Sequence, residues 1–336
     1  MVKKSLLFVS LILALLLSVI APTPAPAAEP ITLSWGFYPP ISDIRTVQCF
    51  KAINWLEERS NYRIKIKFFP AEQLYNANEL WNATRDGLID IGGINTSAFN
   101  GIEPIFEIAT SPGGITTQNW YAIMRKDGLF DKIITPAFKK NKMVALWGVP
   151  TGTQDLIFNK PVRKLEDMKG MLMRSVGGGT DLYLKSYGAS PVRVASSEVY
   201  IAAQRGTIQG ATHSLTSVIS YKEYEILPYM VDDKFGNGFT TMAMNANSFN
   251  SLPADLQQIV VKTFRDVETD WMTTMYTYEV EQMAFLKKQP KFDLYVLPPT
   301  ELARWVAARQ PYWADFQKRV GAPAVEAVKI LKNYWK

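Results

Sequence analysis

The sequence predicts an α/β protein whose two lobes face each other across a cleft. Three observations lead to this fold class. Segments with strand and helix patterns alternate along the chain, which is typical of sheets built from parallel strands. One unit, a helix closed by glycine and followed by a short strand, occurs twice, as ATRDGLIDIGG and as AAQRGTIQGAT. A helical pattern over 253–287 is long enough to extend along both lobes.

The alternation starts at the first strand pattern after the N-terminal segment. In chain order, the patterns predict a strand at 31–37, a helix at 45–60, a strand at 62–69, a helix at 79–86 and a strand at 88–91. Gly87 separates the last two elements, because glycine suits the left-handed position that closes a helix. The second copy of the unit comprises a helix at 198–205 capped by Ser196 or Ser197, then Gly206 and a strand at 207–210.

The repeated unit also predicts where a ligand binds. Its two closing glycines lie 119 residues apart, so each lobe is expected to contain one copy. In open α/β sheets, ligands bind beyond the carboxyl ends of the strands. This rule places Asn95 and Thr96 of one lobe, and Thr212 and His213 of the other, at the cleft.

The remaining helices set the expected lobe boundaries. The long helix has Ser251 as its expected cap, and amphipathic patterns predict two more helices at 299–320 and 322–335. We expect lobe I to comprise 28–150 plus about 240–270. Lobe II is expected to comprise 151–239 plus about 271–336, with crossover segments and the long helix joining the two.

The first 27 residues have the pattern of a secretory signal peptide. Lys3 and Lys4 precede an apolar run from Leu6 to Ile20, and Ala25-Pro26-Ala27 supplies small residues for cleavage near Ala27. The alternative is a membrane anchor, but spanning a bilayer takes ~20 apolar residues and this run is shorter. We therefore expect export to the periplasm.

Composition narrows the possible functions. The formal net charge of +6 falls to +4 without Lys3 and Lys4, and no basic run indicates nucleic-acid binding. His213 is the only histidine and Cys49 the only cysteine, which excludes zinc sites built from several such residues and leaves no intrachain disulfide. Cys49 lies in a helical pattern typical of a buried thiol. Gly177-Gly178-Gly179-Thr180 lacks the lysine of a phosphate-binding loop and predicts a turn before a helix.

Five blocks of residues resemble the DctP-type receptors of tripartite ATP-independent periplasmic (TRAP) transporters. They are Leu165-Glu-Asp-Met-Lys-Gly170, Met173-Arg174, Tyr187-Gly-Ala-Ser-Pro191, Ser197-Glu-Val-Tyr200 and Gly206-x-Ile-x-Gly210, in the family's order. Weaker similarity covers most of the remaining mature chain. The resemblance implies a two-lobed periplasmic binding protein fold (type II-like) with crossing strands and a long hinge-spanning helix. It also implies that the lobes close around an organic acid, which two membrane subunits then transport.

Arg174 falls where the family holds its ligand-clamping arginine. Its planar guanidinium independently suits a carboxylate, with which it can form two parallel hydrogen bonds. Gln154 stands where some family members have a second arginine, so this resemblance favours a monocarboxylate over a dicarboxylate. His213 replaces an asparagine of the family and could donate or accept a hydrogen bond, or supply charge when protonated. A structural role beside the cleft is the alternative for His213.

Several aromatic residues lie near these positions in the sequence. They are Trp35, Phe37 and Tyr38 after the first strand, Trp147 before Gly152, and Phe158 after Gln154. Small-molecule pockets are mainly apolar and aromatic, although each of these residues could equally belong to the core. Together they favour a monocarboxylate with an apolar or aromatic body. We expect no cofactor and no metal.

The sequence therefore indicates a receptor and not an enzyme. The alternatives are a ligand sensor for a membrane signalling partner and an exported hydrolase with acidic residues in the cleft. No GxSxG elbow supports the hydrolase, and a Cys49–His213 nucleophile pair has no sign of activation in its surroundings. As partners we expect a small organic acid and the TRAP membrane subunits, no nucleic acid, and a monomer in preference to a dimer.

Overall fold

The computed structural model describes residues 29–112, 115–233 and 235–334. The predicted signal peptide lies outside these residues. Within them, no helix is both long enough and apolar enough to span a membrane.

In the described part of the chain, ten strands form one continuous network of paired strands across two lobes. They are β1 (Ile31–Gly36), β2 (Ile64–Phe69), β3 (Ile91–Ile94), β4 (Met143–Phe158), β5 (Leu172–Ser175), β6 (Ser190–Arg193), β7 (Gly210–Ser214), β8 (Tyr229–Asp232), β9 (Asn237–Asn245) and β10 (Asp293–Val296). The order is β2-β1-β3-β9-β4-β7-β5-β6, and β8 joins β4 to β10. Each lobe has parallel strands, β2-β1-β3 in lobe I and β7-β5-β6 in lobe II.

Two antiparallel strands connect the lobes. The first part of β4 pairs with β9 in lobe I, and its last residues pair with β7 and β8 in lobe II. The pairing of β4 with β9 shifts register between Pro150 and Thr153, where Gly152 has a positive φ of 80°. The chain therefore crosses between the lobes within a continuous strand.

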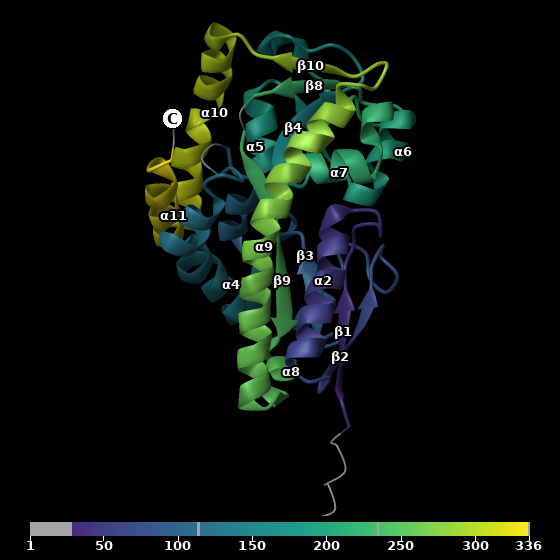
Figure 1. Ribbon diagram of the computed structural model, residues 1–336. Coiled ribbons are helices and arrows are strands. Elements are labelled where there is room, and N and C mark those ends of the chain that lie inside the picture. The colour runs from purple at the N-terminus through teal and green to yellow at the C-terminus, as the bar shows by residue number, and fades with distance from the viewer. Residues whose placement is uncertain (1–28, 113–114, 234, 335–336) are drawn as a thin grey trace, which may run out of the picture.

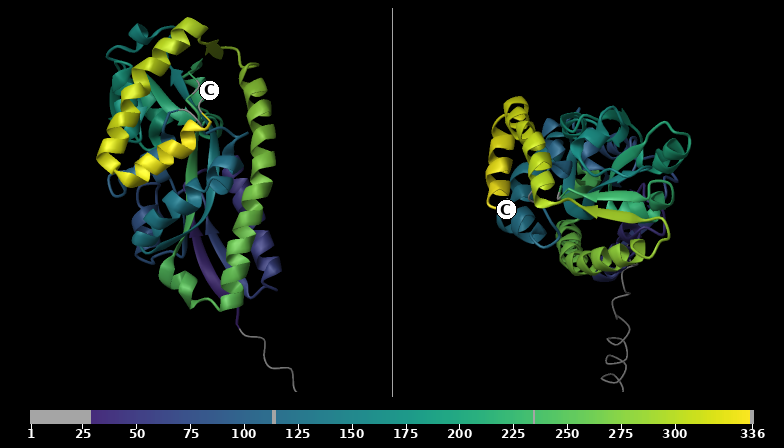
Figure 2. Two further views of the ribbon diagram at one scale, coloured as in Figure 1. Left: turned by 90° about the vertical axis from the view of Figure 1, so that its left-hand side faces the viewer. Right: turned by 90° about the horizontal axis from the view of Figure 1, so that it is seen from above.

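Helices cover both faces of the strands (Figures 1 and 2). The α-helices are α2 (Ile44–Arg59), α3 (Leu80–Arg85), α4 (Thr135–Lys140), α5 (Gly179–Ser186), α6 (Val199–Gln204), α7 (Leu215–Ser220), α8 (Ala246–Ser251), α9 (Ala254–Leu286), α10 (Pro299–Val320) and α11 (Ala322–Lys332). Short 3₁₀ helices include η1 (Thr96–Phe99), η2 (Pro104–Thr110), η5 (Leu165–Met168), η6 (Ser196–Glu198) and η7 (Glu223–Glu225), and π-helical turns occupy η3 (Ala122–Lys126) and η4 (Phe130–Ile134).

The long helix α9 confirms the predicted element at 253–287. Figure 1 shows it running beside both lobes along most of the molecule. The predicted α/β class with two lobes is likewise confirmed by the sheet and by its helices. Ser251 does not cap α9, because its hydroxyl instead donates to the Ser248 carbonyl oxygen (2.8 Å).

Both copies of the repeated unit are present, with one common displacement. Gly87 and Gly206 close their helices with φ of 75° each. The following strands begin at Ile91 and Gly210, three residues after the predicted starts at 88 and 207. Three residues of turn separate each glycine from its strand, and the periodicity of so short a segment does not reveal them.

Among the described residues, the buried apolar side chains form one core in lobe I and two clusters in lobe II. The two C-terminal helices do not both pack within lobe II, to which we expected about 271–336 to belong. Trp305 of α10 lies in a lobe II cluster, whereas Tyr312 and Phe316 of α10 and Leu331 of α11 lie in the lobe I core. Hence α10 crosses between the lobes and α11 packs on lobe I.

Candidate ligand-binding site

The carboxyl ends of the parallel strands from both lobes meet at one cavity. Tyr38 follows β1 and Asn95 follows β3 in lobe I. Arg174 lies in β5, Ser196 follows β6 and His213 lies near the end of β7 in lobe II. All five residues line the same cavity, which has a volume of about 30 Å³. Of the four residues that the strand rule placed at the cleft, Asn95 and His213 line this cavity and Thr96 and Thr212 do not, and the space between the lobes is small in this arrangement.

Arg174 presents a buried positive charge to this cavity. Its side chain donates to the carbonyl oxygens of Val194 (3.1 Å) and Thr212 (2.9 Å) and to the Ser196 hydroxyl (3.1 Å). Only 3% of the residue is exposed, and burial lowers its pKa. Among the described residues no carboxylate lies within ion-pair distance of Arg174. Three of its five N–H groups are used, so one remains on each terminal nitrogen.

His213 belongs to the hydrogen-bond network of Arg174. Its Nδ1 lies 2.8 and 2.9 Å from the two Glu223 oxygens, and its Nε2 lies 3.2 Å from the Ser196 hydroxyl. Burial lowers the pKa of His213 despite the facing Glu223 carboxylate. A neutral ring with its proton on Nδ1 satisfies every contact, because the Ser196 hydroxyl accepts from Arg174 and donates to Nε2. His213 thus lies at the cavity and orients Ser196 beside the arginine.

Ser196 has a different role from the predicted one. We expected Ser196 or Ser197 to cap the helix at 198–205, but α6 has no side-chain cap. The Ser196 hydroxyl is instead occupied by Arg174 and His213. Sequence reasoning could not separate these roles, because a serine before a helix is the usual signal for a cap.

Sequence analysis missed a second arginine in the cavity, Arg45 of α2. Its guanidinium donates to both oxygens of Asp43 (2.8 and 2.7 Å), to the Tyr38 hydroxyl (3.3 Å) and, across the cleft, to the Ser217 hydroxyl (3.1 Å). Burial opposes its charge, but the Asp43 carboxylate outweighs this effect and raises the pKa of Arg45. Asp43 also caps α2 by accepting from the Arg45 backbone N–H (2.9 Å). An Asp-x-Arg at a helix start was the available signal.

Most of the predicted aromatic residues lie in the cores. Trp35 packs against Phe68 and Phe264, and Trp147 also packs against Phe264. Phe158 belongs to a lobe II cluster. None of these three lines the cavity, because their strand positions point into the packed layer between sheet and helices.

Of the other predicted site residues, some line the cavity and some pack behind it. Phe37 is buried behind Tyr38, with ring centroids 5.4 Å apart, whereas Tyr38 lines the cavity. Thr96 forms a hydrogen bond with Thr241 (2.8 Å) and does not line it. Gln154 does line it, and its amide donates to the Thr151 hydroxyl (3.2 Å). Phe239 and Thr240 of β9 complete the floor.

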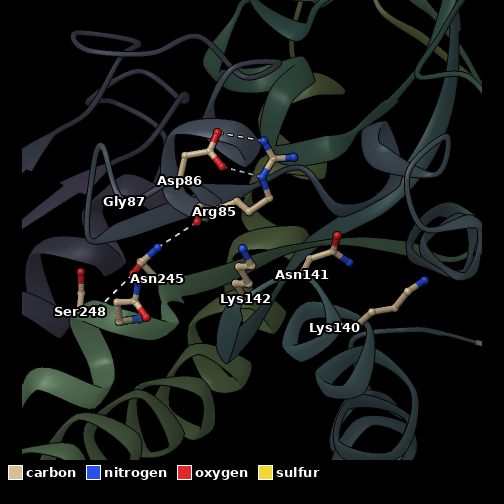
Figure 3. A pocket seen from close by; sticks show the side chains of 9 residues that line it. Arg85, Asp86, Gly87, Lys140, Asn141, Lys142, Asn245 and Ser248 are labelled. Atoms are coloured by element: carbon tan, nitrogen blue, oxygen red, sulfur yellow. Dashed lines mark hydrogen bonds and ion pairs between the residues drawn. The ribbon is translucent and has the colours of Figure 1, made fainter.

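A second hollow lies at the opposite edge of the lobe I sheet, near the start of β3 (Figure 3). Its volume is about 590 Å³, and its charged side chains are Arg85, Asp86, Lys140 and Lys142. Arg85 donates to both Asp86 oxygens, and Lys140 pairs with Glu103 (2.8 Å). These ion pairs neutralise most of the charge of this second hollow. The cavity between the lobes is therefore the candidate ligand site.

Two further arrangements considered from the sequence are not formed. Cys49 is fully buried in the lobe I core, so it does not pair with His213. Over the described part of the chain, no cluster of three or more histidine, cysteine or acidic side chains is arranged to hold a metal ion.

Comparison with known proteins identifies the family. The model of the bacterial extracellular solute-binding proteins, family 7 (DctP), matches residues 48–319. The chain belongs to this family. Curated relatives include a solute-binding protein of Albidiferax ferrireducens, 24% identical over 82% of this chain and 81% of the relative, and the sialic acid-binding periplasmic protein of Vibrio cholerae, 23% identical over 89% and 92%. The resemblance predicted from the sequence is thus confirmed.

Solved structures share the fold of this family 7 protein. A Bordetella pertussis extracytoplasmic solute receptor that binds pyroglutamic acid has a TM-score of 0.84 at 20% identity and covers 90% of this chain and 99% of its own. A TRAP periplasmic solute-binding protein of Desulfovibrio salexigens with bound orotic acid has a TM-score of 0.83 at 23% identity, over 90% and 98%.

A group of carboxylates lies behind Gln154, where the strands of this family 7 protein cross. Asp155 of β4 and Glu279 of α9 line a cavity of about 360 Å³, and Asp232 and Asp233 line its other side. Asp155 accepts a hydrogen bond from the Thr153 hydroxyl (2.8 Å). Burial raises the pKa of Asp155 to about 7, with the nearby carboxylates adding to the shift. The crossing point therefore contains an acid that keeps its proton in weakly acidic solution.

The raised pKa of Asp155 predicts a pH dependence of stability. Between its ordinary pKa of 3.8 and about 7, the folded protein holds a proton that the unfolded chain has released. Stability therefore falls as pH rises through this window and levels off above pH ~7. The Asp155→Asn variant should lose less stability than the wild type between pH 5 and pH 8 in urea unfolding.

The control is Asp266→Asn, because hydrogen bonds from Lys262 and Arg59 lower the pKa of Asp266. That carboxylate is ionised throughout the window, so this variant should lose as much stability between pH 5 and pH 8 as the wild type. Burial also raises the pKa of Asp233 to about 6 and the pKa of Glu268 to about 7. The stability of Asp155→Asn should therefore still depend on pH to some extent. If the free energy of unfolding fell equally between pH 5 and pH 8 in Asp155→Asn and in the wild type, Asp155 would be ionised at pH 5.

Proposed function

We propose that this chain is an extracytoplasmic receptor that closes around a compact organic monocarboxylate and delivers it to the membrane subunits of a TRAP transporter. The observation that carries this proposal is the environment of the Arg174 side chain. Its guanidinium is buried between the lobes, is held by neutral acceptors, and keeps one N–H on each terminal nitrogen for a ligand. Two parallel N–H groups match the two oxygens of a carboxylate.

The ligand carboxylate would serve as the ion-pair partner of Arg174. Burying a charge without a partner is costly, so an arriving anion gains from a site whose desolvation has already occurred. Charge-assisted hydrogen bonds are roughly twice as strong as neutral ones. Together with enclosure by the lobes, such a pair supports micromolar affinity, which requires about −8 kcal/mol.

The charges around the cavity favour one carboxylate over two. Arg45 donates four of its five N–H groups to Asp43, Tyr38 and Ser217, which leaves one N–H on Nη1. Its charge is already balanced by Asp43. His213 is paired with Glu223, and Gln154 is neutral. The distal end of the ligand therefore meets single hydrogen-bond donors, which suit a carbonyl or hydroxyl oxygen.

The shape of the cavity favours a small ligand. A volume of about 30 Å³ is far below the ~300–1,000 Å³ of pockets for drug-sized ligands, so an acid enters when the lobes separate. Val176, Phe239 and the Tyr38 ring supply the apolar surface of the cavity. The aromatic body inferred from the sequence loses the support of Trp35, Trp147 and Phe158. We propose a ligand with a compact body that Val176, Phe239 and Tyr38 can cover.

The relatives support the receptor role and the periplasmic location. The names of two curated relatives describe periplasmic proteins that bind sialic acid and 2,3-diketo-L-gulonate. TRAP periplasmic solute-binding proteins of the same fold were solved with orotic acid and with L-gulonate. All four are binding proteins for organic acids, and we propose that this chain is a monomeric receptor of the same kind, exported by its N-terminal segment.

The receptor proposal predicts stabilisation by organic acids that depends on Arg174. Thermal unfolding of the mature chain would be measured with L-pyroglutamate, orotate, L-gulonate, malonate and N-acetylneuraminate. A bound acid at 100 times its Kd should stabilise the protein by about 2.7 kcal/mol, which raises Tm by several degrees. We expect this rise with a compact monocarboxylate, its loss in Arg174→Ala, and its retention in the control Arg205→Ala, whose side chain is exposed. A stabilising acid that acts equally on Arg174→Ala would exclude the clamp.

The charge balance at Arg45 predicts a change of ligand preference. In Asp43→Asn the side-chain oxygen can still cap α2, but the charge of Arg45 is no longer neutralised. The ratio of malonate affinity to L-pyroglutamate affinity should rise at least tenfold, as measured by isothermal titration of both acids with both proteins. Using the ratio cancels any general loss of stability. An unchanged ratio would show that Arg45 does not contribute to selecting the second group of the ligand.

A further inference from the structure

A larger outer cavity of about 560 Å³ adjoins the cavity between the lobes. The two share Asn95, Arg174, Val176 and Ser196, so the outer cavity is the entrance to the proposed site. Its lobe I side comprises Ala77, Asn78 and residues of the segment 95–102, and its lobe II side includes Arg193–Ser196. Contacts across this entrance determine whether an enclosed acid can leave.

Gly178 of lobe II lies against Asn100 of lobe I, and Phe99 and Gly101 on either side of Asn100 line the outer cavity. A Cβ atom on Gly178 would lie 2.2 Å from Nδ2 and 2.4 Å from Cγ of Asn100. The Asn100 amide is held in place because it donates to the Ser97 carbonyl oxygen (2.7 Å). Gly178 has φ of 55° and ψ of −125°, which a side chain would disfavour. The glycine run before α5 therefore allows lobe I to reach lobe II here.

Arg193 forms a hydrogen bond across the same entrance. Its Nη2 donates to the Ala98 carbonyl oxygen of lobe I (2.8 Å). Its guanidinium lies beside Gly177, where a Cβ atom would be 3.4 Å from Cζ. Within the described residues, no carboxylate lies within ion-pair distance of Arg193. Because bonds to a carbonyl oxygen are weaker than ion pairs, this contact can break and re-form as the lobes move.

We propose that Asn100, Gly178 and Arg193 form an entrance latch that holds the lobes closed and thereby sets the affinity for an acid that none of the three touches. The latch rests on the proposed function in one respect, because it assumes that the lobes close around a ligand. Its contacts join protein atoms of the two lobes directly, so it also stabilises the closed arrangement without an acid. A receptor whose closed fraction is reduced tenfold binds tenfold more weakly.

The first test measures closure without any ligand. Spin labels at Glu58→Cys in lobe I and Lys169→Cys in lobe II report the distance between the lobes, and the only native thiol, Cys49, is buried. Wild type should show a short-distance population that shrinks in Asn100→Phe and in Gly178→Ala. The matched control is Gly170→Ala, where φ is 74° and no atom lies within 4 Å of an added Cβ. Asn100 has φ of −59°, so Asn100→Phe changes size without straining the backbone.

The second test measures affinity by isothermal titration with the acid from the panel that most stabilises wild type. Kd should rise at least tenfold in Asn100→Phe and Gly178→Ala, and severalfold in Arg193→Gln, but not in Gly170→Ala. In the double variant Asn100→Ala/Gly178→Ala the removed side chain leaves room for the added methyl group, but the backbone strain at Gly178 and the loss of the Asn100 contact remain, so Kd should fall only part of the way from that of Gly178→Ala toward that of wild type. If Asn100→Phe and Gly178→Ala both had the same spin-label distances and the same Kd as Gly170→Ala, the latch proposal would be overturned. If no acid bound wild type, the receptor proposal would fail, and the spin-label distances alone would decide the latch.

Discussion

The arrangement of the cavity follows from the burial of the Arg174 guanidinium between two lobes. A charge in this position requires neutral acceptors in defined places, because each unsatisfied N–H would cost free energy. The three acceptors come from two separate segments, namely Val194 and Ser196 after β6 and Thr212 in β7. Parallel pairing of β5 with both β6 and β7 brings these segments to either side of Arg174. The lobe II sheet therefore serves to hold one side chain in a fixed direction.

Around this charge, the other polar side chains at the cavity have partners in their own lobe. Asp43 balances the charge of Arg45, and the Glu223 carboxylate accepts a hydrogen bond from the neutral His213 ring. Each pair lies in a single lobe, so the lobes can separate without breaking either pair. The bond from Arg45 to the Ser217 hydroxyl is the contact of these pairs that crosses the cleft. A hydroxyl is readily replaced by water, and separation therefore costs little in electrostatic free energy.

The sequence predicted the backbone of this molecule better than its side-chain contacts. The closing glycines and the apolar period of α9 are local signals, and they located the two lobes and the cleft. Whether a side chain points to the core or to the cavity depends on the register of pairing with distant strands, as Trp147 and Phe158 of the crossing strand β4 show. Arg45 was missed because an Asp-x-Arg at a helix start is not distinctive by itself, and the other partners of Arg45, Tyr38 and Ser217, are 7 and 172 residues away in the sequence. Arg174 was found through the motif around it, because an arginine in a short strand is not distinctive by itself.

The elements that cross between the lobes share a feature that permits closure. Buried residues from Leu256 to Met275 anchor α9 in the lobe I core, and Leu286 joins it to lobe II, while the turns between are only partly covered. In α10 the crossing from Trp305 to Tyr312 contains Pro311, which removes a helical hydrogen bond at the change of core. In β4 the crossing coincides with Gly152 and a shift of register. Each connection is thus least constrained where it passes from one lobe to the other. Bending can therefore be confined to these points, so that the strand ends holding Arg174 and Tyr38 move as rigid bodies toward each other.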